Sequence, residues 1–354
     1  MNSRHRHPRF AAVIVATAFA LIVTASSRAG FSQTSHPEGA PDSAGPSKVI
    51  IDTDIGDDID DVYALSLALS SPEFHILGIT SAWGDTALRS RLLDRLLCVT
   101  GREEIPVYTG IATTSWHKAG AGAFSQAPWA AAGKERHHVE GDAVPFLLDQ
   151  IRRNPGEVTL IAIGPLTNIG SAIDRDPVTF RKLRRVVLMG GSVVRGYDAS
   201  NGAATPPDAE YNIAMDPAAA RKLFQSGVPV VILPLDSTQL RFDDKKRASF
   251  GSISTPLTDS LLVLTAEWSR TTGYTSPTLF DPVAVAYALD ARSCPATPVH
   301  IEVDDQGFTR QTPGPPNAEA CLSPHPELFF PLLLPRLLNQ RMVGAQACLA
   351  VANP

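Results

Sequence analysis

Six aspartates lie within ten residues near the start of the chain, in the run Asp52–Asp61, whose sequence is Asp-Thr-Asp-Ile-Gly-Asp-Asp-Ile-Asp-Asp. Carboxylates this close repel one another strongly unless water solvates them or a cation holds them. Clustered oxygen ligands suit Ca²⁺ or Mg²⁺ rather than zinc, and the sequence has no Cys/His pattern of the kind that binds zinc. The simpler interpretation is that these acids cap a helix and face water. The density of the run favours a metal centre instead.

The position of the acidic run supports the same interpretation. Residues 48–52 form a short apolar segment typical of a buried strand, and residues 59–70 have the periodicity of a helix. Ligands of open α/β sheets bind at the carboxyl ends of strands, and a helix N-terminus stabilises the acids that begin it. Gly56 also fits, because a backbone that bends closely around an ion often needs a positive φ.

The rest of the chain supplies the elements that must position this run. Short apolar segments rich in β-branched residues alternate with helical patterns, which predicts an α/β fold: a single domain with a mostly parallel, Rossmann-like central sheet flanked by helices. A long loop is expected at 111–141. The predicted strands are 48–52, 74–80, 158–163, 185–189 and 228–233, with helices at 59–70 and 85–100, a pair of strands at 300–303 and 307–312, and a terminal helix at 326–342 that Pro331 and Pro335 interrupt.

The N-terminus has the layout of a secretory signal peptide, with basic residues, an apolar run of about 15 residues and small residues around Ala29. We expect residues 1–29 to be a signal peptide, 30–47 a flexible linker and 48–354 the catalytic domain, exported to the periplasm or outside the cell. The chain carries 31 basic and 36 acidic residues. Loss of a basic leader makes the mature protein more acidic still, which argues against a nucleic-acid partner. No membrane contact is expected after the signal is removed.

The four cysteines divide into two groups. Cys98 lies in an apolar helical pattern and is expected to be a thiol in the core. The others, Cys294, Cys321 and Cys348, cluster late in a chain expected to be exported, where one disulfide among the three is plausible. The spacing leaves the pairing open.

An Asp-x-Asp pair after an apolar strand is also how haloacid-dehalogenase-type phosphatases begin, with a nucleophilic Asp and Mg²⁺. That alternative usually has Thr or Val two residues after the second Asp, where this chain has Gly56. Taken together, the motifs resemble the inosine-uridine nucleoside hydrolase family, which is calcium-dependent and has its own α/β fold. The matching segments occur in the family's order: Asp52–Asp61, Gly164-Pro-Leu-Thr-Asn168, Met189-Gly-Gly191, Ala209-Glu-Tyr-Asn-Ile213, Asp216-Pro217 and Asp281-Pro282.

The resemblance implies a ligand set and a reaction, the hydrolysis of the N-glycosidic bond of ribonucleosides to ribose and free base. Asp54, Asp61 and Asp281 would bind Ca²⁺ together with the backbone carbonyl of Ile163. Asp54 would also take a proton from a Ca²⁺-bound water, because Ca²⁺ acidifies water only modestly. The family is commonly dimeric or tetrameric, so the resemblance allows a homodimer or homotetramer.

The resemblance also implies which side chains bind the substrate. Asp60 would hold ribose hydroxyls, Asp85 would take the place of an Asn beside them, and Glu210 and Asn212 would fix the 5′ and 3′ side of the sugar. Contacts of this kind with the ribose hydroxyls favour a flattened, oxocarbenium-like ribose as the base departs. Trp83 is a candidate for the base pocket, with core packing equally open, and Trp268 has the same two interpretations.

Three departures from the family pattern bear on these roles. The commoner form lacks two of the residues between the Gly and the Asp pair, so Asp57 and Asp58 are additional and their part in the site is open. The Asn expected shortly before the Glu-aromatic-Asn motif has no clean match, since Ala204 sits at that spacing and Asn201 lies three residues earlier. Phe280 stands where members place a His that protonates the base or a Trp that stacks on it.

Because Phe280 cannot donate a proton, help for the leaving base must come from stacking, from another acid or from solvent. His137 and His138 in the long loop are candidates for that acid. A catalytically quiet member that binds nucleoside or sugar without turnover is the alternative that Phe280 favours.

Overall fold

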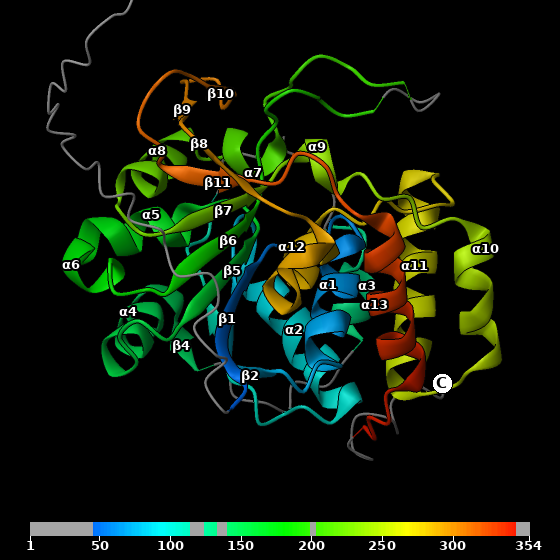
Figure 1. Ribbon diagram of the computed structural model, residues 1–354. Helices are drawn as coiled ribbons and strands as arrows, with labels where there is room; N and C mark the ends of the chain where they lie inside the picture. Colours follow the sequence, from blue (N-terminus) through cyan, green and yellow to red (C-terminus); the bar gives the residue numbers. More distant parts are fainter. Residues whose placement is uncertain (1–44, 114–123, 133–139, 199–202, 345–354) are drawn as a thin grey trace, which may run out of the picture. The chain divides into compact units, whose positions relative to one another are not determined.

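A computed structural model describes residues 45–113, 124–132, 140–198 and 203–344. Within these residues nine strands form one sheet in the order β4-β3-β2-β1-β5-β6-β7-β11-β8 (Figure 1). Every neighbouring pair is parallel except β11 with β8. The predicted α/β fold with a mostly parallel sheet is therefore confirmed.

The elements have the following bounds. The strands of the large sheet are β1 (Ser47–Thr53), β2 (Phe74–Ser81), β3 (Val107–Thr109), β4 (Gly141–Asp142), β5 (Thr159–Ile163), β6 (Arg185–Met189), β7 (Val230–Leu233), β8 (Thr297–Val299) and β11 (Ala318–Ala320), while β9 (Ile301–Val303) and β10 (Thr309–Gln311) form a separate antiparallel pair. The helices are α1 (Asp60–Leu69), α2 (Thr86–Thr100), α3 (Ala127–Ala131), α4 (Ala143–Arg153), α5 (Thr167–Arg175), α6 (Pro177–Phe180), α7 (Tyr211–Ala214), α8 (Pro217–Gln225), α9 (Leu235–Thr238), α10 (Asp244–Arg247), α11 (Pro256–Thr272), α12 (Asp281–Leu289) and α13 (Pro326–Asn339), with short 3₁₀ turns η1 (Ala248–Ser252) and η2 (Ala291–Ser293).

Two apolar cores cover the two faces of the sheet. Successive side chains of a strand point to opposite faces, so Ile51 of β1 packs with helices α1, α2, α11, α12 and α13. Its neighbour Ile50 packs with α4, α5, α6 and α8 on the other face. A strand buried on both faces is a continuous apolar run, which is why these strands could be predicted from sequence.

The chain changes direction across the sheet at β1. From β1 it runs outward through β2, β3 and β4, and it then returns to the opposite side of β1 for β5, β6 and β7. The connections leaving β1 and β5 therefore diverge, which opens a crevice beyond the carboxyl ends of these strands. The acidic run follows β1 directly, so the fold places it in this crevice.

The prediction that the terminal helix is interrupted is wrong, because α13 continues through Pro331 and Pro335. Both prolines lie on the exposed side of the helix, where water can satisfy the backbone carbonyls that lose a donor. Phe329, Leu333 and Leu337 are buried against the core and hold the helix in place.

The three described cysteines are disulfide-bonded. Cys294 is bonded to Cys321, which answers the pairing left open for two of the three late cysteines. The prediction of a core thiol at Cys98 is wrong, because Cys98 is buried but disulfide-bonded. Cys348 lies outside the described residues, as do His137 and His138. Among the residues that are described, no helix has both the length and the apolar character needed to cross a membrane.

Candidate functional site

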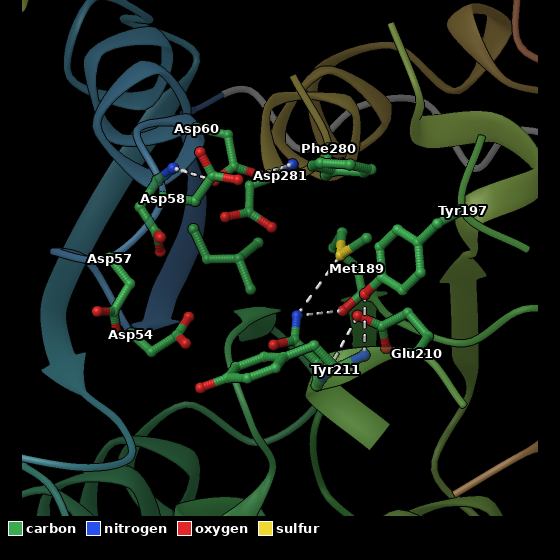
Figure 2. A pocket seen from close by; sticks show the side chains of 13 residues that line it. Asp54, Asp57, Asp58, Asp60, Met189, Tyr197, Glu210, Tyr211, Phe280 and Asp281 are labelled. Atoms are coloured by element: carbon green, nitrogen blue, oxygen red, sulfur yellow. Dashed lines mark hydrogen bonds between the residues drawn. The ribbon is translucent and has the colours of Figure 1, made fainter. Parts of the chain in front are cut away.

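A cavity of about 370 Å³ opens at the carboxyl ends of β1, β5 and β6. Acidic side chains from the connection between β1 and α1 and from the start of α1 form one wall, and an aromatic and amide wall from α7 and the segments around it faces them (Figure 2). Its lining consists of Asp54, Asp57, Asp58, Asp60, Asp61, Ile163, Met189, Tyr197, Glu210, Tyr211, Asn212, Phe280 and Asp281. Of the side chains predicted to form the site, the cavity brings together all but Asp85 and Trp83.

Three carboxylates converge on one point of the acidic wall. Asp60, Asp61 and Asp281 each offer an oxygen, and these oxygens lie within 4.8 Å of one another. All three side chains are almost fully buried. Two come from the first turn of α1 and the third begins α12, which packs along α1. The backbone N–H of Asp281 donates to Oδ2 of Asp60 at 3.2 Å, which ties the two helix ends together.

The electrostatics of this group favour a bound proton or cation. Burial raises the pKa values of Asp60, Asp61 and Asp281 well above the usual value for Asp, and the neighbouring acids raise them further. Oxygen-only ligands of this kind suit Ca²⁺ or Mg²⁺. The donor set therefore fits a hard divalent cation, and Ile163 at the end of β5 lines the same cavity.

Asp54 lies on the same wall, outside the group of three. Burial raises its pKa to about 7, while the charge of Arg89 opposes that rise. Gly164, just after β5, is required for its position: a Cβ there would lie 2.8 Å from the backbone nitrogen of Asp54 and 2.9 Å from its Oδ1. The sequence therefore needs a glycine here to let the chain pass close to this carboxylate.

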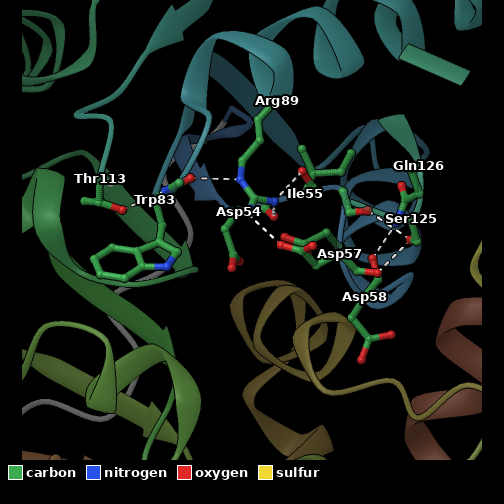
Figure 3. A network of polar contacts seen from close by, with 12 residues as sticks. Asp54, Ile55, Asp57, Asp58, Trp83, Arg89, Thr113, Ser125 and Gln126 are labelled. Atoms are coloured by element: carbon green, nitrogen blue, oxygen red, sulfur yellow. Dashed lines mark hydrogen bonds and ion pairs between the residues drawn. The ribbon is translucent and has the colours of Figure 1, made fainter. Parts of the chain in front are cut away.

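Arg89 of α2 is a feature that sequence reasoning missed. Its side chain is fully buried and its guanidinium donates to the carbonyls of Trp83, Asp54 and Ile55 (Figure 3). It also forms an ion pair with Asp57 at 2.7 Å, and it lies 5.0 Å from the centre of the Phe124 ring. The helical periodicity of α2 places Arg89 outside the apolar stripe and therefore assigns it to solvent. The sequence carried no signal that this arginine is buried.

Asp57 and Asp58, the two additional acids, therefore have different partners. Asp57 is the counterion of Arg89. The Asp58 carboxylate accepts from the backbone N–H of Ile59 at 2.7 Å, and burial raises its pKa to about 6 while a hydrogen bond with Trp268 opposes the rise. Trp268 is thus buried beside the acidic wall rather than on the cavity surface.

The facing wall is organised by Glu210. Its carboxylate accepts three backbone N–H groups, from Gly191 at 2.8 Å, Asn212 at 3.0 Å and Ile213 at 3.2 Å. Burial nevertheless raises its pKa to about 7. Asn212 donates to the carbonyl of Met189 at 3.1 Å, so the end of β6 and the start of α7 are held together.

Aromatic rings close the upper part of the cavity. Phe280 precedes α12 and is in edge-to-face contact with Tyr197, with ring centres 6.2 Å apart. Tyr197 follows β6 and was not selected from the sequence, because a tyrosine in an irregular segment carries no pattern. Figure 2 shows both rings facing the space between the acidic wall and Glu210.

Asp85 and Trp83 do not line the cavity. The Asp85 side chain is exposed and accepts from the backbone N–H of Leu88 at 3.0 Å, which makes Asp85 the N-cap of α2. Trp83 is buried with a φ of 61°, and its indole interacts with the Tyr211 side chain. The position of Trp83 therefore agrees better with core packing than with a place in the lining of the base pocket.

Comparison with known proteins identifies the family. The sequence profile of the inosine-uridine preferring nucleoside hydrolases matches residues 49–330. The chain is 32% identical to the pyrimidine-specific ribonucleoside hydrolase RihA of Citrobacter koseri over 82% of its own length and 97% of RihA. An uncharacterised protein of Schizosaccharomyces pombe is 36% identical over 56% of the chain, and the match spans 64% of that protein.

A solved structure agrees. A plant nucleoside hydrolase superposes with a TM-score of 0.71 at 27% identity, covering 83% of this chain and all of that protein. These likenesses support hydrolysis of the N-glycosidic bond of ribonucleosides, and they leave no support for the phosphatase alternative. The chain belongs to the inosine-uridine preferring nucleoside hydrolase family.

Proposed function

We propose that this nucleoside hydrolase releases free base from ribonucleosides with one bound Ca²⁺ and with Asp54 as general base. The observation that carries the proposal is the group of three buried carboxylates within 4.8 Å of one another on the wall of a cavity large enough for a sugar and part of a base. Bound Ca²⁺ would supply a Lewis acid beside the attacking water and an anchor for the 2′- and 3′-hydroxyls of ribose.

Asp54 is suited to accept the proton of the attacking water. It lines the cavity next to the three carboxylates, and a general base works best when its pKa lies near the working pH. Arg89 donates to the backbone carbonyl of Asp54 rather than to its carboxylate. This bond fixes the backbone of Asp54, a residue that lines the cavity.

The facing wall would hold the sugar. Asp60 and Asn212 lie on opposite sides of the cavity, and Glu210 is fixed beside Asn212 by backbone donors. Groups so fixed can favour the flattened ribose that forms as the base departs.

Among the described residues no histidine lines the cavity, so none of the described histidines can protonate the leaving base. Phe280 would stack on the base, and solvent or another group would supply the proton. A catalytically quiet member that binds nucleoside without turnover stays the second candidate, because Phe280 cannot act as an acid.

The decisive experiment measures reducing sugar released from a panel of purine and pyrimidine ribonucleosides, with Ca²⁺ and with chelator. The enzyme, Asp54→Ala and the control Asp149→Ala are compared; Asp149 lies on α4 and is absent from the cavity lining. Calcium-dependent release that Asp54→Ala abolishes and Asp149→Ala retains supports the proposal and names the preferred base. No release from any nucleoside, with calcium bound, would refute turnover and favour the quiet alternative.

We also propose that the protein is exported and that residues 1–29 are its signal peptide. The Cys294–Cys321 disulfide supports an oxidising compartment. Fractionation of cells that express the full chain, with sequencing of the mature N-terminus, tests this. An N-terminus that still begins at Met1 in the cytoplasmic fraction would contradict it.

A further inference from the structure

The segment that carries Tyr197 is held firmly, although it lies outside the helices and strands. Asp236 accepts the backbone N–H groups of Val193, Val194 and Arg195 at 2.8 to 3.1 Å. These contacts fix the chain just before Tyr197.

The residues that flank Tyr197 are fixed as well. Gln239 donates to the carbonyl of Gly196 at 2.9 Å and accepts from the N–H of Asp198 at 2.6 Å. The N–H of Tyr197 itself donates to Asp208 at 3.0 Å, and its carbonyl accepts from the hydroxyl of Thr205 at 2.6 Å. A side chain on so constrained a backbone is preorganised for a directed contact.

The hydroxyl of Tyr197 has one hydrogen bond among the residues that the structure describes, and it is the acceptor in that bond. The donor is the backbone N–H of Tyr211, at 3.1 Å. Its own proton is therefore available for a ligand. Burial and the nearby Glu210 carboxylate raise the pKa of this phenol, so it keeps that proton at neutral pH.

Glu210 offers the complementary group. Counting donors among the described residues, Oε2 accepts from Gly191 and Ile213, while Oε1 accepts only from Asn212. A carboxylate oxygen can accept two hydrogen bonds, so Oε1 retains one site. Figure 2 shows the Tyr197 hydroxyl and the Glu210 carboxylate on the same side of the cavity.

A fixed donor beside a fixed acceptor matches a ligand hydroxyl, which both donates and accepts. We propose that Tyr197 is a substrate-positioning residue that donates to the 5′-hydroxyl oxygen of the nucleoside while Glu210 accepts the hydroxyl's proton. This rests on the proposed function, in which the three carboxylates anchor the opposite edge of ribose. Tyr197 then supplies the contact left open by Ala204, where the family pattern has an Asn.

The test removes the hydroxyl of Tyr197 and, separately, the 5′-hydroxyl of the substrate. We would compare the enzyme and Tyr197→Phe on a ribonucleoside and on its 5′-deoxy analogue, under saturating Ca²⁺. Loss of one neutral hydrogen bond should lower kcat/KM for the ribonucleoside by about 3- to 10-fold. The 5′-deoxy analogue has no hydroxyl to bind, so the substitution should leave its kcat/KM almost unchanged.

This comparison separates contact with the substrate from a purely structural role. Tyr197→Phe also removes the acceptor of the Tyr211 N–H, and damage from that source lowers kcat/KM for both substrates equally. Tyr108→Phe is the control, since Tyr108 stacks on Phe146 and does not line the cavity. Equal losses on both substrates, or no loss on either, would overturn the assignment.

Failure of the proposed function gives a different result from failure of the Tyr197 assignment. If the unmodified enzyme cleaves no nucleoside, hydrolysis is refuted, and the same two ligands are compared by calorimetric binding to the enzyme and to Tyr197→Phe. A loss of affinity confined to the ribonucleoside supports the Tyr197 contact without turnover. A loss shared by both ligands, or none, overturns it.

Discussion

Removing the divalent cation should destabilise this protein, and the loss should grow as the pH rises. At an effective dielectric constant of about 20, two carboxylates 4.8 Å apart repel by about 3.5 kcal/mol. Without a cation, burial and this repulsion raise the pKa values of Asp60, Asp61 and Asp281 well above the usual range, which favours their protonated forms. A bound cation replaces those protons.

Asp54 gives the size and the sign of the effect. Burial raises its pKa from 3.8 to about 7, so the folded protein binds this proton more tightly than the unfolded chain does. The folded state of the chelated protein therefore loses stability as the pH rises from about 4 to about 7, and the loss is constant above that. For this group alone the loss is about 4 kcal/mol.

The assay is urea unfolding with Ca²⁺ and with chelator, at about pH 5 and about pH 8. The stability that Ca²⁺ adds should be several kcal/mol larger at the higher pH. Asp281→Asn should lose most of this response and should stabilise the chelated protein at the higher pH, because it removes one buried acid. Asp149→Asn on α4 should behave like the unmodified protein. A calcium effect that is absent, or equal at both pH values, would refute the reasoning.

Three further predictions concern the frame around the site. Arg89→Gln should lower the free energy of unfolding in urea by about 3–5 kcal/mol, since it leaves Asp57 and three backbone carbonyls without their donor. Asp57→Asn should lower it by less, because the Asp57 side chain is 41% exposed. Equal losses for the two variants would contradict this. Gly164→Ala should lower kcat in nucleoside hydrolysis while circular dichroism stays native, because its Cβ would push on Asp54; an unchanged kcat would show that the close approach is not required. Leu333→Ala should lower the free energy of unfolding, measured by thermal denaturation, by about 2–5 kcal/mol, since this leucine is buried where α13 packs on the core. A change below about 1 kcal/mol would mean that the core does not hold the proline-containing helix.

Much of the fold was predictable because its signals are local. The strands that became β1, β2, β5, β6 and β7 are continuous apolar runs, and α1 and α2 have helical periodicity. The break expected in α13 was wrong for a non-local reason: the prolines face outward, and Leu333 between them is buried by other parts of the chain.

The sequence by itself determined the family motifs, the order of the elements and the acidic character of the site, because these depend on residue type and spacing along the chain. Only the tertiary structure decided that Asp60 joins Asp61 and Asp281, since α1 and α12 are distant in sequence. It likewise decided that Asp57 pairs with a buried Arg89 and that Tyr197 and Glu210 lie on the same side of the cavity. Such contacts follow from how strands and helices pack, and a linear pattern carries no information about which side chains packing brings together.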